Sequence, residues 1–236
     1  MTTRRTFISA LPILGVAAAA GDLRAAPAQC SVFTAARQKA TSPDDALRML
    51  QEGNARFVAG QTTNCDFMAQ VKQTAAGQAP FAAIVGCIDS RVPPEFLFDQ
   101  QIGDIFCARI AGNFVDIDIL GSLEFATKVA GARLVVVMGH TECGAVKGAV
   151  DGVKLGNLTA MLKHFDPAIA ASKGVPGEHN SKNKTYVQAV ADANAKIGVQ
   201  QIMTRSPVMR DLVKAKELRV VAAMTNIATG QVTFFS

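Results

Sequence analysis

Residues 81–91 read FAAIVGCIDSR, and residues 134–145 read LVVVMGHTECGA. Each stretch begins with an almost uninterrupted apolar run and passes directly into cysteine, histidine, acidic or basic side chains. A short continuous apolar run is typical of a strand buried on both faces of a parallel sheet. Because open α/β sheets bind ligands at the carboxyl ends of their parallel strands, we expect these polar side chains to meet at one edge of the sheet.

Two further apolar runs, residues 104–110 and 218–223, are expected to be strands of the same sheet. Segments of helical character at 121–129, 146–165 and 187–213 separate the strands, which gives the alternating order of an α/β protein. Residues 231–235 follow Thr229-Gly230 too closely for a crossover helix. The predicted fold is therefore a mostly parallel central β-sheet with flanking helices and an antiparallel edge strand at the C-terminus.

The rest of the chain gives a simple organisation. Ser42-Pro43-Asp44-Asp45 is typical of a helix start, because Ser caps free N–H groups, Pro fits the first turn and acids suit the positive end of the dipole. Residues 174–183 are rich in Gly, Pro, Asn and Lys and are expected to be a loop. We expect one catalytic domain over 29–236, with an N-terminal arm and helix at about 29–60, and no internal repeat.

Composition excludes several classes of function. The chain has 236 residues, of which 49% are hydrophobic and 18% charged, which is typical of a globular protein and not of a disordered one. The net charge of +5 falls to +3 without residues 1–28, which hold three basic residues and one acidic residue. No basic cluster follows, and one Tyr with no Trp offers few stacking platforms, so nucleic acid is not an expected partner.

The first 28 residues have the pattern of an export signal. Arg4-Arg5 precedes the uncharged stretch 7–20, and Ala26-Pro27-Ala28 offers a small-residue cleavage site. The paired arginines resemble a twin-arginine signal, which predicts a periplasmic protein. The uncharged stretch is shorter than the roughly 20 residues that a membrane span needs, so no stable span is expected. An uncut N-terminal tethering helix is the alternative.

Two cysteines and one histidine follow the first and third predicted strands: Cys87, His140 and Cys143. Two thiolates and an imidazole form a known zinc set, in which three protein ligands leave a fourth position open for water or substrate. A buried cysteine that serves only as a small apolar side chain is the alternative. Asp89 and Arg91 place a carboxylate and a guanidinium beside the first cysteine, which favours a catalytic site.

These motifs closely resemble the paired signature of the β-class carbonic anhydrases. The signature segments are CIDSRVPPE at 87–95 and GHTECGA at 139–145. Further segments resemble the family in the same order: EGNARF at 52–57, GDIF at 103–106, RIAGN at 109–113, GSLEF at 121–125 and TGQV at 229–232. The resemblance covers residues 42 to 235, nearly all of the chain beyond the signal.

The resemblance implies zinc-dependent, reversible hydration of carbon dioxide to bicarbonate and a proton, with one Zn²⁺ per chain. It implies Cys87, His140 and Cys143 as zinc ligands and Asp89 with Arg91 as the catalytic dyad. The substrate site would include Gln78, Phe106, Ala111, Phe125 and Gly144. It also implies a homodimer or tetramer, because part of the pocket would come from a neighbouring subunit.

Some features depart from the family or stay open. Phe125 stands where Tyr is common, and Arg109 matches the Arg of a bicarbonate inhibition site whose Trp this chain lacks. His164, His179 and Tyr186 are open alternatives for a proton shuttle. Export permits a Cys30–Cys65 disulfide, with Cys107 buried in its strand, and free thiols are the alternative. Rival functions are carbonyl sulfide or carbon disulfide hydrolysis on the same fold, and noncatalytic zinc or bicarbonate binding.

Overall fold

The computed structural model describes residues 30–235. At its centre lies a five-stranded sheet with the order β2-β1-β3-β4-β5. The strands are β1 (Ala82–Gly86), β2 (Ile105–Arg109), β3 (Leu134–His140), β4 (Arg219–Thr225) and β5 (Val232–Phe234). The first four strands run parallel, and β5 pairs antiparallel with β4. The predicted mostly parallel sheet with an antiparallel edge strand at the C-terminus is confirmed.

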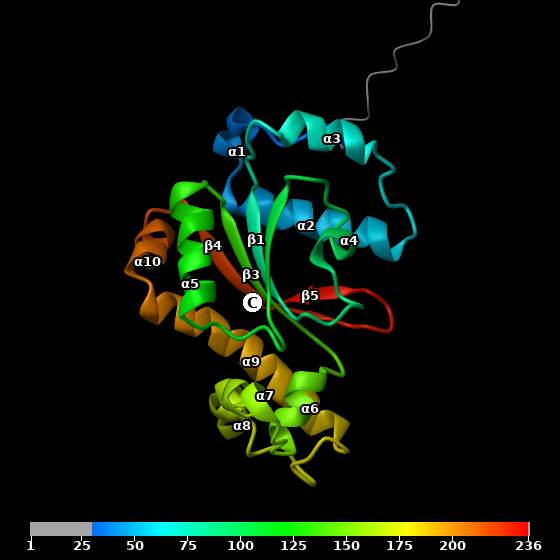
Figure 1. Ribbon diagram of the computed structural model, residues 1–236, viewed down its shortest axis with the longest axis vertical. Helices are drawn as coiled ribbons and strands as arrows, with labels where there is room; N and C mark the ends of the chain where they lie inside the picture. Colours follow the sequence, from blue (N-terminus) through cyan, green and yellow to red (C-terminus); the bar gives the residue numbers. More distant parts are fainter. Residues whose placement is uncertain (1–29, 236) are drawn as a thin grey trace, which may run out of the picture.

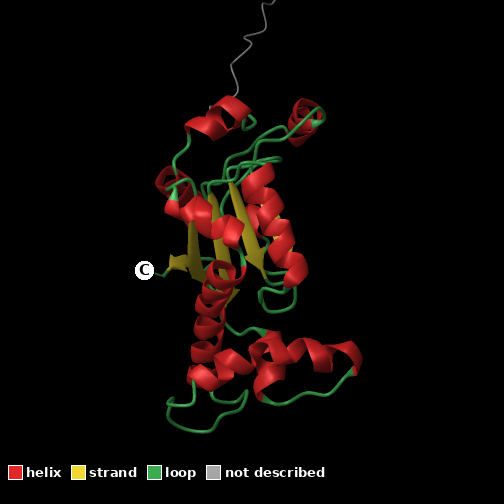
Figure 2. Ribbon diagram, turned by 90° about the vertical axis from the view of Figure 1, so that its left-hand side faces the viewer, coloured by secondary structure: helices red, strands yellow, loops and turns green. Residues whose placement is uncertain are grey.

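Helices flank this sheet, and a group of short helices lies beyond its carboxyl edge (Figure 1). In chain order the helices are α1 (Ala35–Ala40), α2 (Pro43–Val58), α3 (Phe67–Thr74), α4 (Pro94–Leu97), α5 (Ile117–Glu124), the π-helix η2 (Phe125–Val129), α6 (Gly144–Val150), α7 (Gly156–Met161), the 3₁₀-helix η3 (Leu162–Phe165), α8 (Asp166–Ala171), α9 (Lys184–Arg205) and α10 (Pro207–Lys214). Figure 2 shows the long helix α9 running from this group up to the sheet.

Two apolar layers form because successive side chains of a strand point to opposite faces of the sheet. Ile84 and Val136 pack in one layer with Leu50 of α2. Val85 and Val137 pack in the other layer, with side chains of α5, η2, α9 and α10. The strands β1 and β3 are buried throughout, as their continuous apolar runs predict.

Local chemistry sets where the helices begin and divide. Ser42 caps α2 by accepting from the Asp45 N–H, while the Asp45 carboxylate accepts from the Ser42 N–H, so the predicted helix start is confirmed. The helical segment 146–165 is divided into shorter helices by a turn in which Gly152 has a φ of +65°. The segment 187–213 is divided before Pro207, which has no backbone N–H and follows the cap residue Ser206.

The N-terminal arm holds more structure than the sequence predicts. It contains α1, and Cys30 is joined to Cys65, just before α3, by a disulfide. The expected burial of Cys107 is wrong, because β2 is an edge strand and leaves this side chain half-buried. The predicted signal at 1–28 lies outside the described residues. Among the helices that the structure describes, none has the length and apolarity that crossing a membrane requires.

Candidate metal centre

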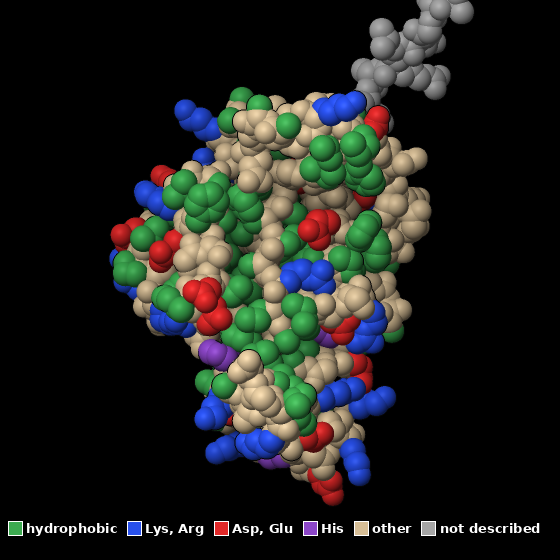
Figure 3. All heavy atoms as spheres, in the orientation of Figure 1, with side chains coloured by type: hydrophobic (Ala, Val, Ile, Leu, Met, Phe, Trp, Pro, Cys, Tyr) green, Lys and Arg blue, Asp and Glu red, His purple; other side chains and the backbone are tan. Residues whose placement is uncertain are grey.

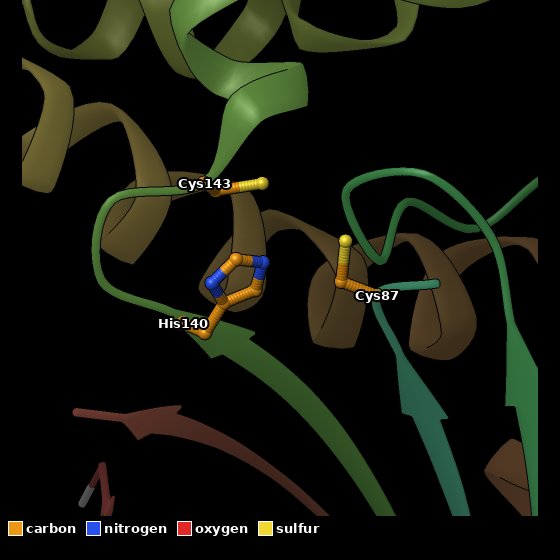
Figure 4. Close-up of side chains that lie close together, drawn as sticks. All are labelled: Cys87, His140 and Cys143. Atoms are coloured by element: carbon orange, nitrogen blue, oxygen red, sulfur yellow. The ribbon is translucent and has the colours of Figure 1, made fainter. Parts of the chain in front are cut away.

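Cys87, His140 and Cys143 come together at the carboxyl edge of the sheet. Cys87 directly follows β1, His140 is the last residue of β3, and Cys143 is the N-cap of α6. All three are buried, and their ligand atoms lie within 4.8 Å of one another. Figure 4 shows the two thiols and the imidazole gathered around one point. The convergence expected from the two strand ends is thus present.

The imidazole of His140 is oriented as a metal ligand requires. Its Nδ1 lies 2.9 Å from the Thr141 carbonyl oxygen. Because a carbonyl can only accept, Nδ1 carries the proton and Nε2 keeps a free lone pair. Nε2 is buried and has no hydrogen-bond partner. A buried polar atom without a partner is costly, and a bound cation would satisfy it. The donor set therefore fits zinc.

The two thiols differ in acidity because they form a hydrogen-bonded pair. The pKa of Cys87 is lowered by the hydrogen bond from Cys143 and, further, by His140 and the backbone N–H groups of Asp89 and Gly112. The pKa of Cys143 is raised by its hydrogen bond to Cys87 and by burial. Since the thiolate is the form that binds metal, the Asp89 and Gly112 N–H groups that point to Cys87 Sγ favour its metal-binding form.

Asp89 and Arg91 form a two-point contact beside the ligands. The Arg91 guanidinium donates from Nε to Asp89 Oδ1 at 2.9 Å and from Nη2 to Oδ2 at 2.7 Å. This contact holds the pKa of the Asp89 carboxyl well below its usual range, so the group is ionised at neutral pH. Asp89 Oδ2 also lies 3.8 Å from His140 Nε2. The carboxylate therefore faces the metal centre while Arg91 holds it.

Two supporting contacts were not predicted from the sequence. Arg109 donates from Nε to the Cys87 carbonyl at 2.8 Å and from Nη2 to the Asp89 carbonyl at 2.7 Å. The Gly112 N–H points to Cys87 Sγ at 3.3 Å. Both residues lie in the RIAGN motif, but only the pairing of β1 with β2 shows that the motif faces the first ligand. The planar Arg109 fork thus fixes the backbone that carries Cys87 and Asp89.

The remaining predicted substrate residues fall into two groups. Ala111 precedes Gly112 in the loop beside Cys87, and Gly144 follows Cys143 at the start of α6. Gln78, by contrast, precedes β1 at the opposite edge of the sheet. Phe106 is in register with Ala83, four residues before Cys87, which is a separation of about 13 Å along a strand. The structure therefore does not bring Gln78 or Phe106 to the metal centre of its own chain.

Phe106 and Phe125 instead line an apolar groove beside the edge strand β2. Their rings pack edge to face with centroids 6.3 Å apart. The groove has a volume of about 770 Å³ and is also lined by side chains of β2, α5 and η2. Phe125 is 53% exposed and Ile117 is 69% exposed. Hydrophobic side chains are visible on the face that carries α5 and α3 (Figure 3). Exposed apolar side chains grouped in this way are typical of interaction surfaces.

The residues considered for proton transfer are each placed against another ring. His164 is exposed and stacks on Phe114, with ring centroids 4.1 Å apart. His179 is exposed and stacks on Tyr186, which is buried. None of these contacts involves a metal ligand. This geometry does not favour any of the three residues as the proton shuttle.

The fold and site define an α/β protein whose mostly parallel sheet carries, at its carboxyl edge, a Cys₂His cluster that could hold a metal ion. The family model described as "Carbonic anhydrase" matches residues 82–232, which include the three ligands, the Asp89–Arg91 pair and four of the five strands completely. The chain belongs to the carbonic anhydrase family, and its fold is that of the β class.

Curated relatives carry the same family name. The chain is 46% identical over 122 residues to carbonic anhydrase 2 of Mycobacterium tuberculosis, which covers 50% of this chain and 58% of the relative. It is 31% identical over 147 residues to a carbonic anhydrase of Pseudomonas aeruginosa, covering 60% and 67% of the two chains. The matched part therefore spans only a little more than half of the mycobacterial relative.

Solved structures show the same architecture. A tetrameric β-carbonic anhydrase of Sordaria macrospora is similar with a TM-score of 0.62 and 26% identity, over 70% of this chain and 85% of that one. The β-carbonic anhydrase CafA of Aspergillus fumigatus is similar in fold with a TM-score of 0.64 and 24% identity, over 82% of this chain and 90% of that one.

Proposed function

We propose that this protein is a zinc enzyme that reversibly hydrates carbon dioxide to bicarbonate and a proton. The observation that carries the proposal is the ionised Asp89 carboxylate, held by Arg91 and facing the partnerless Nε2 of His140. A structural Cys₂His site would use a fourth protein ligand and would need no such acid and base pair. Family membership and the named relatives support the same activity.

Cys87, His140 and Cys143 would hold the zinc ion. When bound, zinc supplies a Lewis acid that lowers the pKa of water. Asp89 Oδ2 is then an acceptor that orients the nucleophilic water, and it can do so only while ionised. Arg91 keeps the carboxylate ionised and holds it away from the metal position. The apolar side chains assigned to the substrate site suit a nonpolar substrate that leaves as an anion.

The substrate is tested with purified, zinc-loaded protein. We expect rapid hydration of carbon dioxide, and we expect Cys87→Ser to lose most of its zinc and its activity because it removes a thiolate ligand. The same preparation is offered carbonyl sulfide and carbon disulfide. Sulfide release without hydration would replace the proposed substrate, and full zinc content with no reaction on any of the three would indicate a noncatalytic protein.

We also propose that the protein works as a homodimer or a larger even-numbered assembly. Gln78, Phe106 and Phe125 lie away from their own metal centre, so they can contribute to catalysis only at the site of a second copy. The apolar groove and the open edge of β2 supply a surface for that copy. The tetrameric relative of Sordaria macrospora supports an assembly. A fully active monomer in sedimentation velocity would overturn it.

For localisation, we propose export to the periplasm through a twin-arginine signal at residues 1–28. The Cys30–Cys65 disulfide supports this, because disulfides persist mainly in oxidising compartments. Replacing both Arg4 and Arg5 by Lys keeps the positive charge, and we expect it to block export if the receptor reads the guanidinium groups. Normal export of that variant would favour another route.

A further inference from the structure

A second group of linked residues lies at the amino edge of the sheet, opposite to the metal centre: the Cys30–Cys65 disulfide, α3 and Gln78. There the arm around Cys30 is linked to the start of α3 by the Cys30–Cys65 disulfide, across a sequence separation of 35 residues. Figure 1 shows α1 and α3 together at the end of the molecule opposite to α6, α7 and α8. Gln78, the residue assigned above to the site of a second copy, follows α3 by four residues.

The helix α3 has little apolar packing of its own. Gln70 is its only buried residue, while Phe67, Met68 and Val71 are exposed. An eight-residue helix with so few buried apolar contacts has little stability from packing. Its position therefore depends on specific links to the rest of the chain.

Those links run through the disulfide and through Gln70. The Gln70 amide donates from Nε2 to the Cys30 carbonyl at 3.1 Å and accepts at Oε1 from the Ile102 N–H at 3.4 Å. At the other end of α3, the methyl group of Thr74 packs so closely on Gly103 that a Cβ there would lie 3.0 Å from it. Cys30 thus holds this segment twice: by the covalent bond to Cys65, just before α3, and by the hydrogen bond from Gln70, within α3.

The arm also fixes the segment on the far side of Gln78. Gln38, in α1, donates from Nε2 to the Pro80 carbonyl at 2.7 Å and to the Ala130 carbonyl at 2.8 Å. Phe33 packs on Phe81 with ring centroids 5.1 Å apart. The exposed Gln78 therefore lies between two segments that the arm holds: α3 on one side, through Cys30, and Pro80 with Phe81 on the other. The disulfide fixes the first residue of that arm, Cys30, to Cys65.

We propose that the Cys30–Cys65 disulfide positions Gln78 for substrate binding, so that the affinity for substrate depends on the oxidation state of this pair. The proposal rests on the function proposed above, in which Gln78 completes the site of a second copy. Cys65 is half-buried, so an external thiolate can attack its sulfur. A dithiol reductant would give two electrons and two protons, break the S–S bond, leave two thiols and become a disulfide itself.

The test is a double-mutant cycle between the disulfide and Gln78. We expect Cys30→Ala/Cys65→Ala to keep its zinc, because neither cysteine is a ligand, and to raise KM about tenfold through misplacement of Gln78. We expect Gln78→Ala to have a similar effect, and the combined variant to be no worse than Gln78→Ala alone. Hydrogen exchange of amides 67–78 should become faster in the disulfide variant. Additive effects on KM would show that the disulfide acts elsewhere.

Two controls separate this inference from general loss of stability and from failure of the proposed function. Ser42→Ala removes the cap of α2 but touches neither α3 nor Gln78, so it should lower stability without changing KM. The wild type is also reduced with a phosphine, with thiols counted and zinc measured, which avoids substitution altogether. An oxidised wild type without hydratase activity refutes the proposed function. An active wild type whose KM and exchange are unchanged by reduction refutes only the role of the disulfide.

Discussion

The Asp89 carboxylate accepts three hydrogen bonds from Arg91: two from the guanidinium and one from the backbone N–H at 3.0 Å. Arg91→Ala removes the two side-chain bonds and the positive charge, so the Asp89 pKa should rise and its carboxylate should be free to turn toward His140 Nε2. We expect turnover to fall about a hundredfold with zinc content unchanged. Steady-state hydration and elemental analysis on the same preparation measure both.

Arg91→Lys is the matched control for charge. It keeps the positive charge but has no planar fork, so it should restore only part of the activity that Arg91→Ala loses. Near-normal turnover of both variants with full zinc would show that the Asp89–Arg91 pair is structural.

Individual residues of the site could be predicted only in part. Cys87, His140 and Cys143 follow from the apolar runs before them, because strand ends of a parallel sheet share an edge. The roles of Arg109 and Gly112 could not be predicted in this way, because they depend on which residue of β2 stands beside Gly86. Cys107 was wrongly expected to be buried, because the sequence does not show that β2 is an edge strand.

The loop between β2 and α5 joins the sheet to the metal centre through Gly112. Gly112 has a φ of +90°, and a Cβ there would lie 2.2 Å from Cζ of Phe165. Gly112→Ala therefore combines an unfavourable backbone conformation with a steric clash, and we expect it to cost about 3 kcal/mol of unfolding free energy. Because the Gly112 N–H points to Cys87 Sγ, zinc content should fall as well.

Gly60→Ala separates the cost of the backbone conformation from the cost of the steric clash. Gly60 also has a positive φ, +67°, but no atom lies within 4 Å of the position of a Cβ. Its substitution should cost only about 1 kcal/mol and should leave zinc bound. Urea unfolding and zinc analysis of both variants make the comparison, and equal losses at the two positions would contradict the packing argument.

Strands and helices were easier to predict than their boundaries. The apolar runs identify all five strands. The reason is clearest for β1 and β3, which are buried throughout and have no polar alternation to obscure them, whereas β2 and β5 are only partly buried. The helices α1 and α3 were not predicted. The helix α1 has no buried residue, and the short apolar stripe of α3 is exposed and not packed on the core. Their place depends on Gln38, Gln70 and the disulfide, which are contacts distant in sequence.

The stability of the whole chain should depend on Asp104, which lies in the protein interior at the start of β2. Burial raises its pKa to about 6, although hydrogen bonds from Gln101 and Phe33 and the charge of Arg37 oppose the shift. Its Oδ1 is buried without a partner. The folded state therefore favours the protonated form of Asp104. The resulting contribution to the free energy of unfolding is fully present below the unfolded pKa near 3.8 and is lost as pH rises through about 6.

Asp104→Asn should remove that pH dependence. The difference in unfolding free energy between wild type and variant should shift by about 3 kcal/mol at most in favour of the variant between pH 4 and pH 7. Circular dichroism during urea unfolding, at fixed zinc, gives the difference at each pH. Asp211→Asn alters an exposed carboxylate and controls for net charge. A constant difference across this range would show that Asp104 does not titrate in the folded protein.

The proposed assembly predicts that two inactive or weak variants can complement each other in a mixed dimer. If the metal of one copy works with Gln78 of the other, then Cys87→Ser and Gln78→Ala damage different halves of each site. In a mixed dimer, one site combines both lesions, but the other receives zinc ligands from the Gln78→Ala chain and an intact Gln78 from the Cys87→Ser chain. Measured at substrate concentrations below the KM of the wild type, where Gln78→Ala is also weak, the mixture of the two variants should therefore regain activity.

The expected gain can be calculated from random pairing. Half of the dimers are then mixed and each has one complete site of two, so about a quarter of wild-type activity should return. The two variants are unfolded together, refolded with zinc and assayed beside each variant refolded alone. As a control, Cys87→Ser mixed with His140→Ala must show no gain, because both lesions affect metal ligands. If the Gln78→Ala mixture also shows no gain while native mass spectrometry confirms mixed dimers, then Gln78 does not act across the interface.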